Sequence, residues 1–162
     1  NPKAAASLST SLQQGKIEKW YQAVICGKPV DNNGTYVDYL KQDKKNNCSR
    51  IVDKSDPESK RAELEYKVLD CIRTEEKDSQ YLSLVEIKLL TGRHHQIRVQ
   101  FSGHGTPLYG DGKYGNNEKA VRKSLALCAC HLKFKHPATG KIMDFQIKPD
   151  TGAFKLFSKS ND

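Results

Sequence analysis

The chain has 162 residues, of which 36% are hydrophobic, a mean hydropathy of −0.72 and a formal net charge of +8. Its length suits one domain with its own core, while no apolar run approaches the roughly 20 residues of a membrane helix and no signal peptide is visible. The basic excess favours a polyanionic partner, with nucleic acid first, although charge taken alone fits solubility equally well.

Residues 2–14 predict a helix. Pro2 suits a first turn, and the apolar side chains of Ala4, Leu8 and Leu12 recur on one helical face before Gly15, a natural stop. The first residue is not a methionine, which is compatible with processing, renumbering or a missing upstream segment.

A strand is predicted over residues 16–27, where alternating residues indicate that both faces are largely covered. Residues 27–60 are polar and rich in turn signals, so we expect turns and short strands there, including one over residues 35–40. We expect residues 41–47 to form an exposed loop.

The next two predicted strands form a hairpin. Residues 62–69 alternate, and 81–90 form the longer partner strand across a turn at 74–80. In the first of these strands the residues expected to face the core are Ala62, Leu64, Tyr66 and Val68, with Glu63, Glu65 and Lys67 facing outward.

The segment TGRHHQIRVQF, residues 91–101, carries the strongest chemical signal. A short helix is predicted to start near His94, with Ile97 and Phe101 buried at i, i+4 spacing. Arg98 then sits at the edge of the buried face and points toward a cleft, whereas Arg93 stays more exposed. Both guanidinium groups suit an anion, either phosphate or carboxylate.

The two histidines of this segment do not predict a metal site. His94 and His95 are adjacent, so on a helix they point apart, and no carboxylate follows at i+4. We expect no metal, and polar or hydrogen-bonding roles for both rings.

The C-terminal part predicts a glycine-rich irregular segment over 105–115, then a strand at 125–134 paired with another at 142–147. The five cysteines are scattered and odd in number, which favours a reducing, cytoplasmic location, and we expect Cys128 and Cys130 to be small buried strand residues. The fold class predicted is α+β, with a mixed, mainly antiparallel sheet and few helices.

Three blocks together resemble the RluA family of pseudouridine synthases. They are IEKWYQAVICG at 17–27, LLTGRHHQIRVQFSGHGTPLYGDGKYG at 89–115 and LALCACHLKFKHPATG at 125–140, with Cys128 where the family usually has histidine. The resemblance runs over about residues 1–149, and the combined pattern is far more specific than any one block.

The resemblance implies isomerisation of uridine to pseudouridine in ribosomal or transfer RNA. The C1′–N1 bond breaks, the base turns and it rejoins through C5, with no metal, nucleotide or other cofactor. The base must leave its stack, which suits a basic surface that grips phosphate. We expect RNA binding through a face that includes Arg93, a cytoplasmic location and a monomer.

The resemblance also implies residue roles. Tyr21 matches the tyrosine that packs on the flipped base and is implicated in proton removal from C5, and Arg98 matches the basic partner of the catalytic aspartate. Leu127 matches the residue that lines the base pocket. Arg93, His95 and Gln96 belong to the same motif and would support the site or bind the RNA backbone. Without the motif, Tyr21 would be an ordinary strand aromatic and Leu127 plain core.

One departure from the family is large. The H-R-L-D-x-x-T-S-G motif that carries the nucleophilic aspartate is absent. Asp111 suits a loop-structuring role through side-chain bonds to the backbone instead. We therefore expect residues 1–162 to be a partial catalytic domain that is inactive alone, with Arg98 lacking a counter-charge and facing water or an anion.

Two other functions fit parts of the sequence. The first is a non-catalytic RNA-binding module derived from such an enzyme. The second is a tyrosine recombinase, whose H-x-x-R box His95 and Arg98 also match, but four residues are a weak signal and a strand-rich chain does not suit that helical domain.

Overall fold

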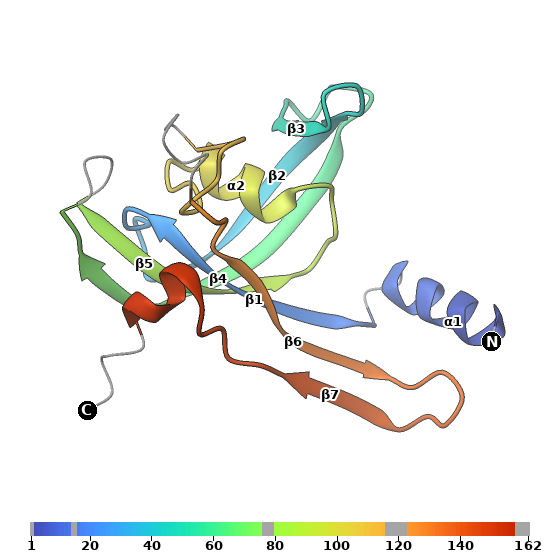
Figure 1. Cartoon of the computed structure of the whole chain (residues 1–162). Coiled ribbons are helices and arrows are strands. Elements are labelled where there is room, and N and C mark those ends of the chain that lie inside the picture. Colours follow the sequence, from blue (N-terminus) through green and yellow to red (C-terminus); the bar gives the residue numbers. More distant parts are fainter. Residues whose placement is uncertain (1, 14–15, 76–79, 116–122, 158–162) are drawn as a thin grey trace.

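The fold is described from a computed structural model, which describes residues 2–13, 16–75, 80–115 and 123–157 (Figure 1). The elements in chain order are α1 (Pro2–Gln13), β1 (Glu18–Cys26), β2 (Asn33–Asp43), β3 (Cys48–Ile51), β4 (Lys60–Arg73), β5 (Tyr81–Leu89), α2 (Gln96–Gly103), β6 (Leu127–Lys135), β7 (Ile142–Gln146) and the 3-10 helix η2 (Gly152–Phe157). The predicted α+β class is confirmed, and the strand-dominated content removes the recombinase alternative.

All seven strands form one sheet in the order β3-β2-β4-β5-β1-β6-β7, and each described pairing is antiparallel. The predicted hairpins β4–β5 and β6–β7 are both present. Strand β1 lies between β5 and β6, so that Ala23 opposes Val85 on one side and Leu127 on the other. Residues that oppose each other share a face, which puts Leu127 and Ala23 on the same side of the sheet.

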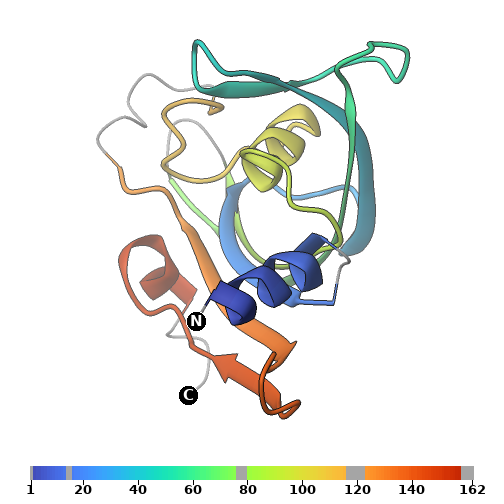
Figure 2. The same ribbon diagram turned by 90° about the vertical axis from the view of Figure 1, so that its right-hand side faces the viewer.

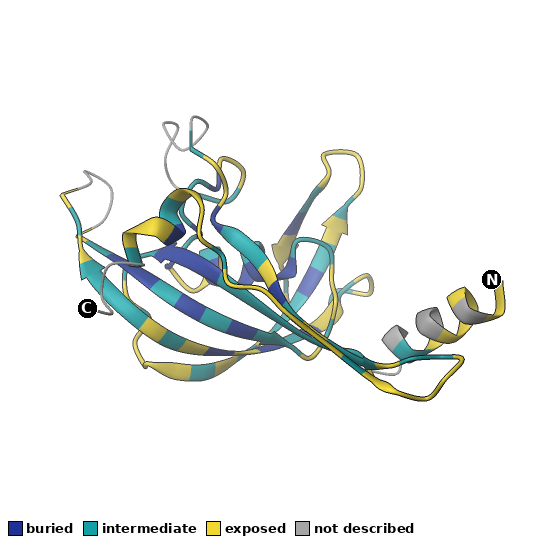
Figure 3. Cartoon of the chain, turned by 60° about the horizontal axis from the view of Figure 1, so that its bottom comes forward, coloured by how far each residue is buried: buried dark blue, intermediate teal, exposed yellow. Residues whose placement is uncertain are grey.

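One face of the sheet curls around α2 (Figure 2). Ile97 and Phe101 of α2, which are 4% and 0% exposed, pack against this face, as their i, i+4 spacing predicts. The strand residues of the same cluster are Ala23, Ile25, Leu64, Tyr66, Val85 and Ile87. The alternation of buried and exposed positions appears as stripes across the strands (Figure 3).

The opposite face of β1 and β5 is covered by η2. Phe154 of η2 packs there against Val24, Leu82 and Ala126. Strand β1 is therefore covered on both faces at Ala23–Val24–Ile25, as the sequence predicts, but its first five residues are only half-buried.

The region 27–60 contains more strand than its sequence predicts. Lys41–Asp43 belong to β2 and only residues 44–47 form a turn, so the prediction of a loop over 41–47 is wrong for its first three residues. Backbone pairing of β2 with β4 and β3 compensates for the polar side chains, which carry no strong strand signal of their own. Asn47 closes the turn with a φ of 48°, in the left-handed region.

The N-terminal helix is confirmed over Pro2–Gln13. The predicted stop at Gly15 and the apolar side chains of Ala4, Leu8 and Leu12 lie outside the described residues. No helix in the described ranges is both long and apolar enough to cross a membrane.

Phe101→Ala should destabilise the fold by about 3–5 kcal/mol, since it empties the space between α2 and the sheet. Urea denaturation would measure this loss. Phe145→Ala is the matched control, because Phe145 is 52% exposed on β7, and it should cost under about 1 kcal/mol. Equal losses in both variants would contradict the position of the core.

Candidate functional site

The turn between β5 and α2 is fastened by the buried side chain of Gln96. Its Oε1 accepts hydrogen bonds from Thr91 Oγ1 at 2.8 Å and from the Arg93 amide at 2.9 Å. Its Nε2 donates to the Glu63 carbonyl of β4 at 3.0 Å. In this structure Gln96 therefore supports the loop, and it is only 3% exposed.

Arg93 is exposed on the same turn, as the sequence predicts. Its Nε donates to the carbonyl of Arg61 at 2.8 Å, which aims the side chain along the surface near β4. The terminal nitrogens of this guanidinium have no hydrogen-bond acceptor in the described part of the chain, so they are available to an anion.

The two histidines precede α2 instead of starting it. His95 has a φ of 53°, and this left-handed residue turns the chain so that α2 begins at Gln96. The rings of His94 and His95 consequently lie 3.8 Å apart, centre to centre. The prediction that they point apart on a helix is wrong, because local periodicity does not reveal a left-handed turn.

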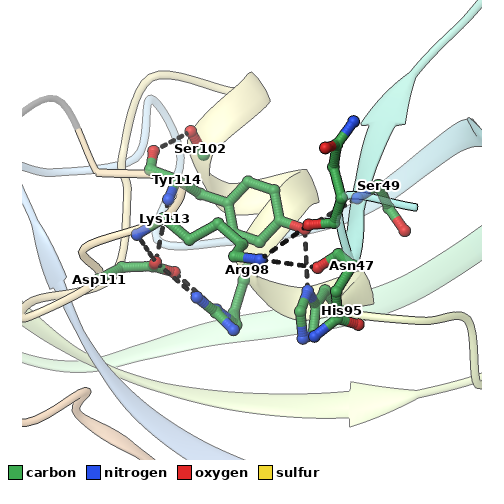
Figure 4. A network of polar contacts seen from close by, with 9 residues as sticks. Asn47, Ser49, His95, Arg98, Ser102, Asp111, Lys113 and Tyr114 are labelled. Carbon is green, nitrogen blue, oxygen red and sulfur yellow. Dashed lines mark hydrogen bonds and ion pairs between the residues drawn. The ribbon is translucent and has the colours of Figure 1, made fainter. Parts of the chain in front are cut away.

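Arg98 of α2 forms a bidentate ion pair with Asp111 (Figure 4). Its Nε donates to Oδ2 at 2.8 Å and its Nη2 donates to Oδ1 at 2.7 Å. The Asp111 side chain is 0% exposed and that of Arg98 is 18% exposed. Because the pair is bidentate and shielded from solvent, its two ionic hydrogen bonds are strong. Removing one partner alone would destabilise the fold, since the other charge would stay buried without compensation.

Asp111 also organises its own loop, as predicted. Its Oδ1 accepts from the amides of Lys113 and Tyr114 at 2.9 and 3.0 Å. Burial raises the pKa of this carboxyl, but the bonds from Arg98 and from the two amides outweigh it, and the net pKa lies below its ordinary value. Asp111 is thus held as a carboxylate.

The prediction that Arg98 lacks a counter-charge is therefore wrong. The glycine-rich segment runs back along β1, where Leu108 bridges Ile25, and Gly110 (φ 76°) then turns the chain so that Asp111 meets α2. A Cβ at Gly110 would overlap the backbone of Ser124, so the turn needs glycine. The only feature of the sequence that could have indicated this ion pair is the position of Asp111, thirteen residues after Arg98.

Tyr114 connects this ion pair to β3. Its ring lies 4.9 Å from the Arg98 guanidinium carbon, and its hydroxyl accepts the Ser49 amide proton at 2.9 Å. The same hydroxyl lies 2.9 Å from Nδ1 of His95. Sequence reasoning missed Tyr114 and Ser49, because residues 65 positions apart carry no mutual signal.

His95 is suited to its neutral form. Since the Tyr114 oxygen accepts from Ser49, its own proton is free to be donated to an unprotonated Nδ1. Burial lowers the pKa of His95, and the positive charges of Arg98, His94 and Lys113 lower it further against a smaller opposing effect of Asp111. Protonation would therefore weaken the Tyr114 link.

Tyr21 and Leu127 pack on the cluster that contains Ile97 and Phe101. The structure therefore brings both residues to the face that α2 covers, although no hydrogen bond joins Tyr21 to Arg98 within the described ranges. The ordinary pKa of a tyrosine hydroxyl already exceeds physiological pH and burial raises the pKa of Tyr21 further, so Tyr21 is a neutral phenol.

A hollow of about 300 Å³ lies beside Tyr21. Its walls are mainly apolar and come from β1, β6 and the residues around β7, namely Lys19, Tyr21, Ala129, Cys130, His131, Leu132, Phe145 and Ile147. This volume is at the lower end for a small-molecule site.

The cysteines and other metal-ligating side chains of the described residues are not arranged as a metal site. All five cysteines are free thiols, with Cys130 buried and Cys128 half-buried in β6. Within the described residues, no three His, Cys, Asp or Glu side chains are grouped to hold a metal ion.

Tyr114→Phe should destabilise the fold by about 1–2 kcal/mol, because the Ser49 amide and His95 both lose their partner. The Ser49 amide should also exchange with solvent faster, as measured by NMR hydrogen exchange. Tyr39→Phe is the control, since the Tyr39 hydroxyl has no hydrogen bond to a described residue. If Ser49 exchanged at an unchanged rate, the role given to Tyr114 would be wrong.

Stability should fall as the pH is lowered through the ordinary histidine pKa of about 6.5 toward the lowered pKa of folded His95. Between these two pKa values the unfolded chain binds the proton more readily than the folded chain, so lowering the pH favours unfolding. Above this range His95 is neutral in both states, and its contribution to the stability of the fold is fully present. Urea midpoints at pH 7.5 and 5.5 would test this. His95→Asn, which tolerates a positive φ, should reduce the difference, whereas His136→Asn in the distant β6–β7 turn should not.

Comparison with known proteins agrees with the motif pattern. Residues 1–103 match the family model described as RNA pseudouridylate synthase. Ribosomal large subunit pseudouridine synthase D of Zymomonas mobilis is 33% identical over 153 residues, which cover 90% of this chain and 45% of that protein. The uncharacterized RNA pseudouridine synthase YlyB of Bacillus subtilis is 35% identical over 146 residues, with the same two coverages. The chain thus spans less than half the length of these relatives.

The fold is also similar to that of a solved structure. Human RNA pseudouridylate synthase domain containing 1 superposes with a TM-score of 0.76 at 23% identity, covering 93% of this chain and 62% of that chain. At 23% identity, this similarity shows that the two proteins share a fold and nothing more. Relatives named ribosomal large subunit pseudouridine synthase C and D confirm the resemblance to the RluA family. Because the family model matches well over half of the chain, including the segments of Tyr21 and Arg98, the chain belongs to the RNA pseudouridylate synthase family.

Proposed function

We propose that the protein to which this chain belongs isomerises uridine to pseudouridine in structured RNA. Ribosomal RNA is the first candidate, because relatives are named ribosomal large subunit pseudouridine synthases, and transfer RNA is the second. The proposal depends above all on one observation. Tyr21 and Leu127, from neighbouring strands, lie on the sheet face against which Ile97 and Phe101 of α2, the helix that carries Arg98, are packed.

The arrangement suits an extruded base. Tyr21 forms one wall of the 300 Å³ hollow, so a base that has left its stack finds an aromatic ring there. Its hydroxyl is a neutral phenol whose pKa burial raises further, so it can take the proton on C5 only after it has passed its own proton to water or another acceptor. We assign Leu127 to the lining of the same face, Arg93 to the RNA backbone, and Gln96 and His95 to the support of the loop.

The nucleophilic carboxylate is proposed to come from outside these 162 residues. Asp111 is unsuited to the role, since it is fully buried and its oxygens accept from Arg98 and two amides. Arg98 uses Nε and Nη2 for Asp111, and its Nη1 has no acceptor in the described part of the chain. A second carboxylate could be oriented there, with Asp111 holding the guanidinium in place.

The chain is accordingly proposed to be part of a catalytic domain, residues 1–162, without turnover of its own. No metal or other cofactor is needed in this scheme. The free cysteines and the RNA substrate support a cytoplasmic location, and we propose a monomer.

Activity would be tested by release of tritium from RNA labelled at C5 of uridine, because C5 loses its hydrogen when it is rejoined to C1′. The 162-residue chain alone should release none, whereas a longer protein with an H-R-L-D segment ahead of residue 1 should turn over. In the longer protein, Arg98→Met should lower kcat by about 10²-fold or more, because a misplaced catalytic group costs about that much.

Lys135→Met is the control for the loss of a long cationic side chain far from α2, and it should retain activity. Turnover by the chain alone would refute the external carboxylate. An inactive longer protein that still binds RNA would favour the non-catalytic RNA-binding module instead.

A further inference from the structure

We propose that Lys19 is the group that accepts the hydroxyl proton of Tyr21, so that Tyr21 can in turn remove the proton from C5 of the uridine. This inference rests on the function proposed above and deepens it, because it assigns a proton acceptor to Tyr21. Lys19 acts on the substrate only through Tyr21, so it is a positioning residue for the transferred proton and not a group that touches the base.

Lys19 and Tyr21 line the same hollow from the same strand. They are two residues apart on β1, so their side chains lie on one face of the sheet. Both contribute to the walls of the 300 Å³ hollow, whose remaining walls come from β6 and the residues around β7 (Figure 1). Strand residues at this spacing are about 7 Å apart along the chain, a separation that a flexible lysine side chain can span.

The amine of Lys19 has no counter-charge in the described part of the chain. No described carboxylate forms an ion pair with Lys19, and none lines the hollow. Glu18, its neighbour in sequence, points to the other face of β1, where it meets Lys88 Nζ at 3.5 Å. Lys19 is thus a half-buried cation among mainly apolar walls, which is a costly position for a group with only a structural role.

This environment makes Lys19 a better proton acceptor than an exposed lysine. Burial lowers the pKa of Lys19, because the charged ammonium form loses hydration. Its neutral amine is therefore populated at lower pH than in an ordinary lysine. A lysine whose pKa is lowered in this way suits the role of a general base.

His131 also lines the hollow, but its ring is engaged on the other face of the sheet. It opposes Trp20 in the β1–β6 pairing, and the two rings stack with their centres 4.2 Å apart. Its Nε2 lies 2.8 Å from Oδ1 of Asp144. Because Trp20 and Tyr21 are adjacent on a strand, their side chains point to opposite faces, and the His131 ring lies on the face away from Tyr21.

The remaining groups around the hollow do not accept a proton readily. Cys130 is a neutral thiol, since burial raises its pKa, and its Sγ lies 3.5 Å from the carbonyl of Trp20. The strands β5 and β7 and the residue after β7 present apolar side chains here, namely Ile87 opposite Tyr21, Phe145 opposite Leu132, and Ile147. Lys19 is therefore the best-placed base among the described residues that line the hollow.

The proton transfers balance over one turnover. The neutral amine of Lys19 takes the hydroxyl proton of Tyr21, which leaves a phenolate beside an ammonium group. Once C5 has bonded to C1′, the phenolate takes the proton from C5. The electron pair of the C5–H bond then forms the C5–C6 double bond, and the pair shared by C6 and N1 moves to N1. N1 gains the proton that the ammonium group gives up through water, so Tyr21 and Lys19 return to their starting forms.

The test measures tritium release from C5-labelled RNA by the longer protein with an H-R-L-D segment ahead of residue 1. Lys19→Ala should lower kcat about 10²-fold, the lower end for loss of a positioned acid–base group, and leave KM for the RNA within about threefold. Lys135→Ala is the control on exposed β6 and should retain wild-type activity. Thermal melts would confirm that both variants fold.

Chemical rescue separates proton transfer from charge. Ethylamine added to Lys19→Ala should raise kcat about tenfold or more, in proportion to its unprotonated form, because a small amine can replace the lost base. Guanidine should not rescue, and Lys19→Arg should stay slow, since a guanidinium group carries the charge but does not accept a proton at neutral pH.

A double variant tests whether Lys19 acts through Tyr21. If it does, Tyr21→Phe/Lys19→Ala should be no slower than Tyr21→Phe alone, because the phenylalanine variant has no hydroxyl proton to transfer. Losses that multiply in the double variant would show that Lys19 acts independently and would overturn the inference.

Full activity of Lys19→Arg would also overturn it, since only a positive charge would then be needed. The same holds if Lys19→Ala matches the Lys135→Ala control, or if it raises KM with kcat unchanged, as loss of an RNA-binding cation would. In each of these cases the wild type still turns over, so the proposed isomerisation stands. An inactive wild type would overturn the proposed function and this inference together.

Discussion

The ion pair between Arg98 and Asp111 is the interaction on which the rest of the candidate site depends. It joins α2 to the glycine-rich segment across thirteen residues of chain, with both guanidinium contacts under 3 Å. The pair is shielded from solvent, so neither charge can be removed alone without leaving the other uncompensated. Asp111 also accepts hydrogen bonds from two backbone amides of its own loop, so the ion pair is part of the structure of that loop.

Two sets of contacts connect this ion pair to the rest of the site. Through Tyr114 it reaches Ser49 and His95, and so fixes the β2–β3 hairpin against α2. Through Ile97 and Phe101, which lie on the same helix as Arg98, it reaches the sheet face of Tyr21 and Leu127. A polar network thus defines one side of the site and an apolar cluster the other, and each restricts the movement of Arg98.

This division has a physical consequence for chemistry on RNA. An enzyme that extrudes a base needs an apolar wall for the ring and fixed cations for the backbone, and these requirements conflict within one small surface. Here the apolar wall lies at β1 and β6, while the exposed Lys44 and Lys45 lie in the turn between β2 and β3 at one edge of the sheet. Helix α2 packs on the face of β1 through Ile97 and Phe101 and also contacts β2 and β3, so it connects the two regions.

The sequence by itself determined the fold class, the alternating strands at 62–69 and 81–90, the burial of Ile97 and Phe101, the exposure of Arg93 and the family motif. These properties depend on local periodicity or on contiguous residues, which a single sequence contains. The identity of the β2–β3 hairpin was less accessible, because β2 is stabilised by backbone pairing with β4 and not by its own polar side chains.

Only the tertiary structure decided which group Arg98 meets, how the two histidine rings lie and that Tyr114 connects the loop to β3. The first two follow from left-handed residues, Gly110 and His95, whose φ values of 76° and 53° redirect the chain by amounts that no periodic pattern records. The third joins residues 65 positions apart. Such contacts become favourable only when the sheet brings their elements together, so they are properties of the folded chain as a whole.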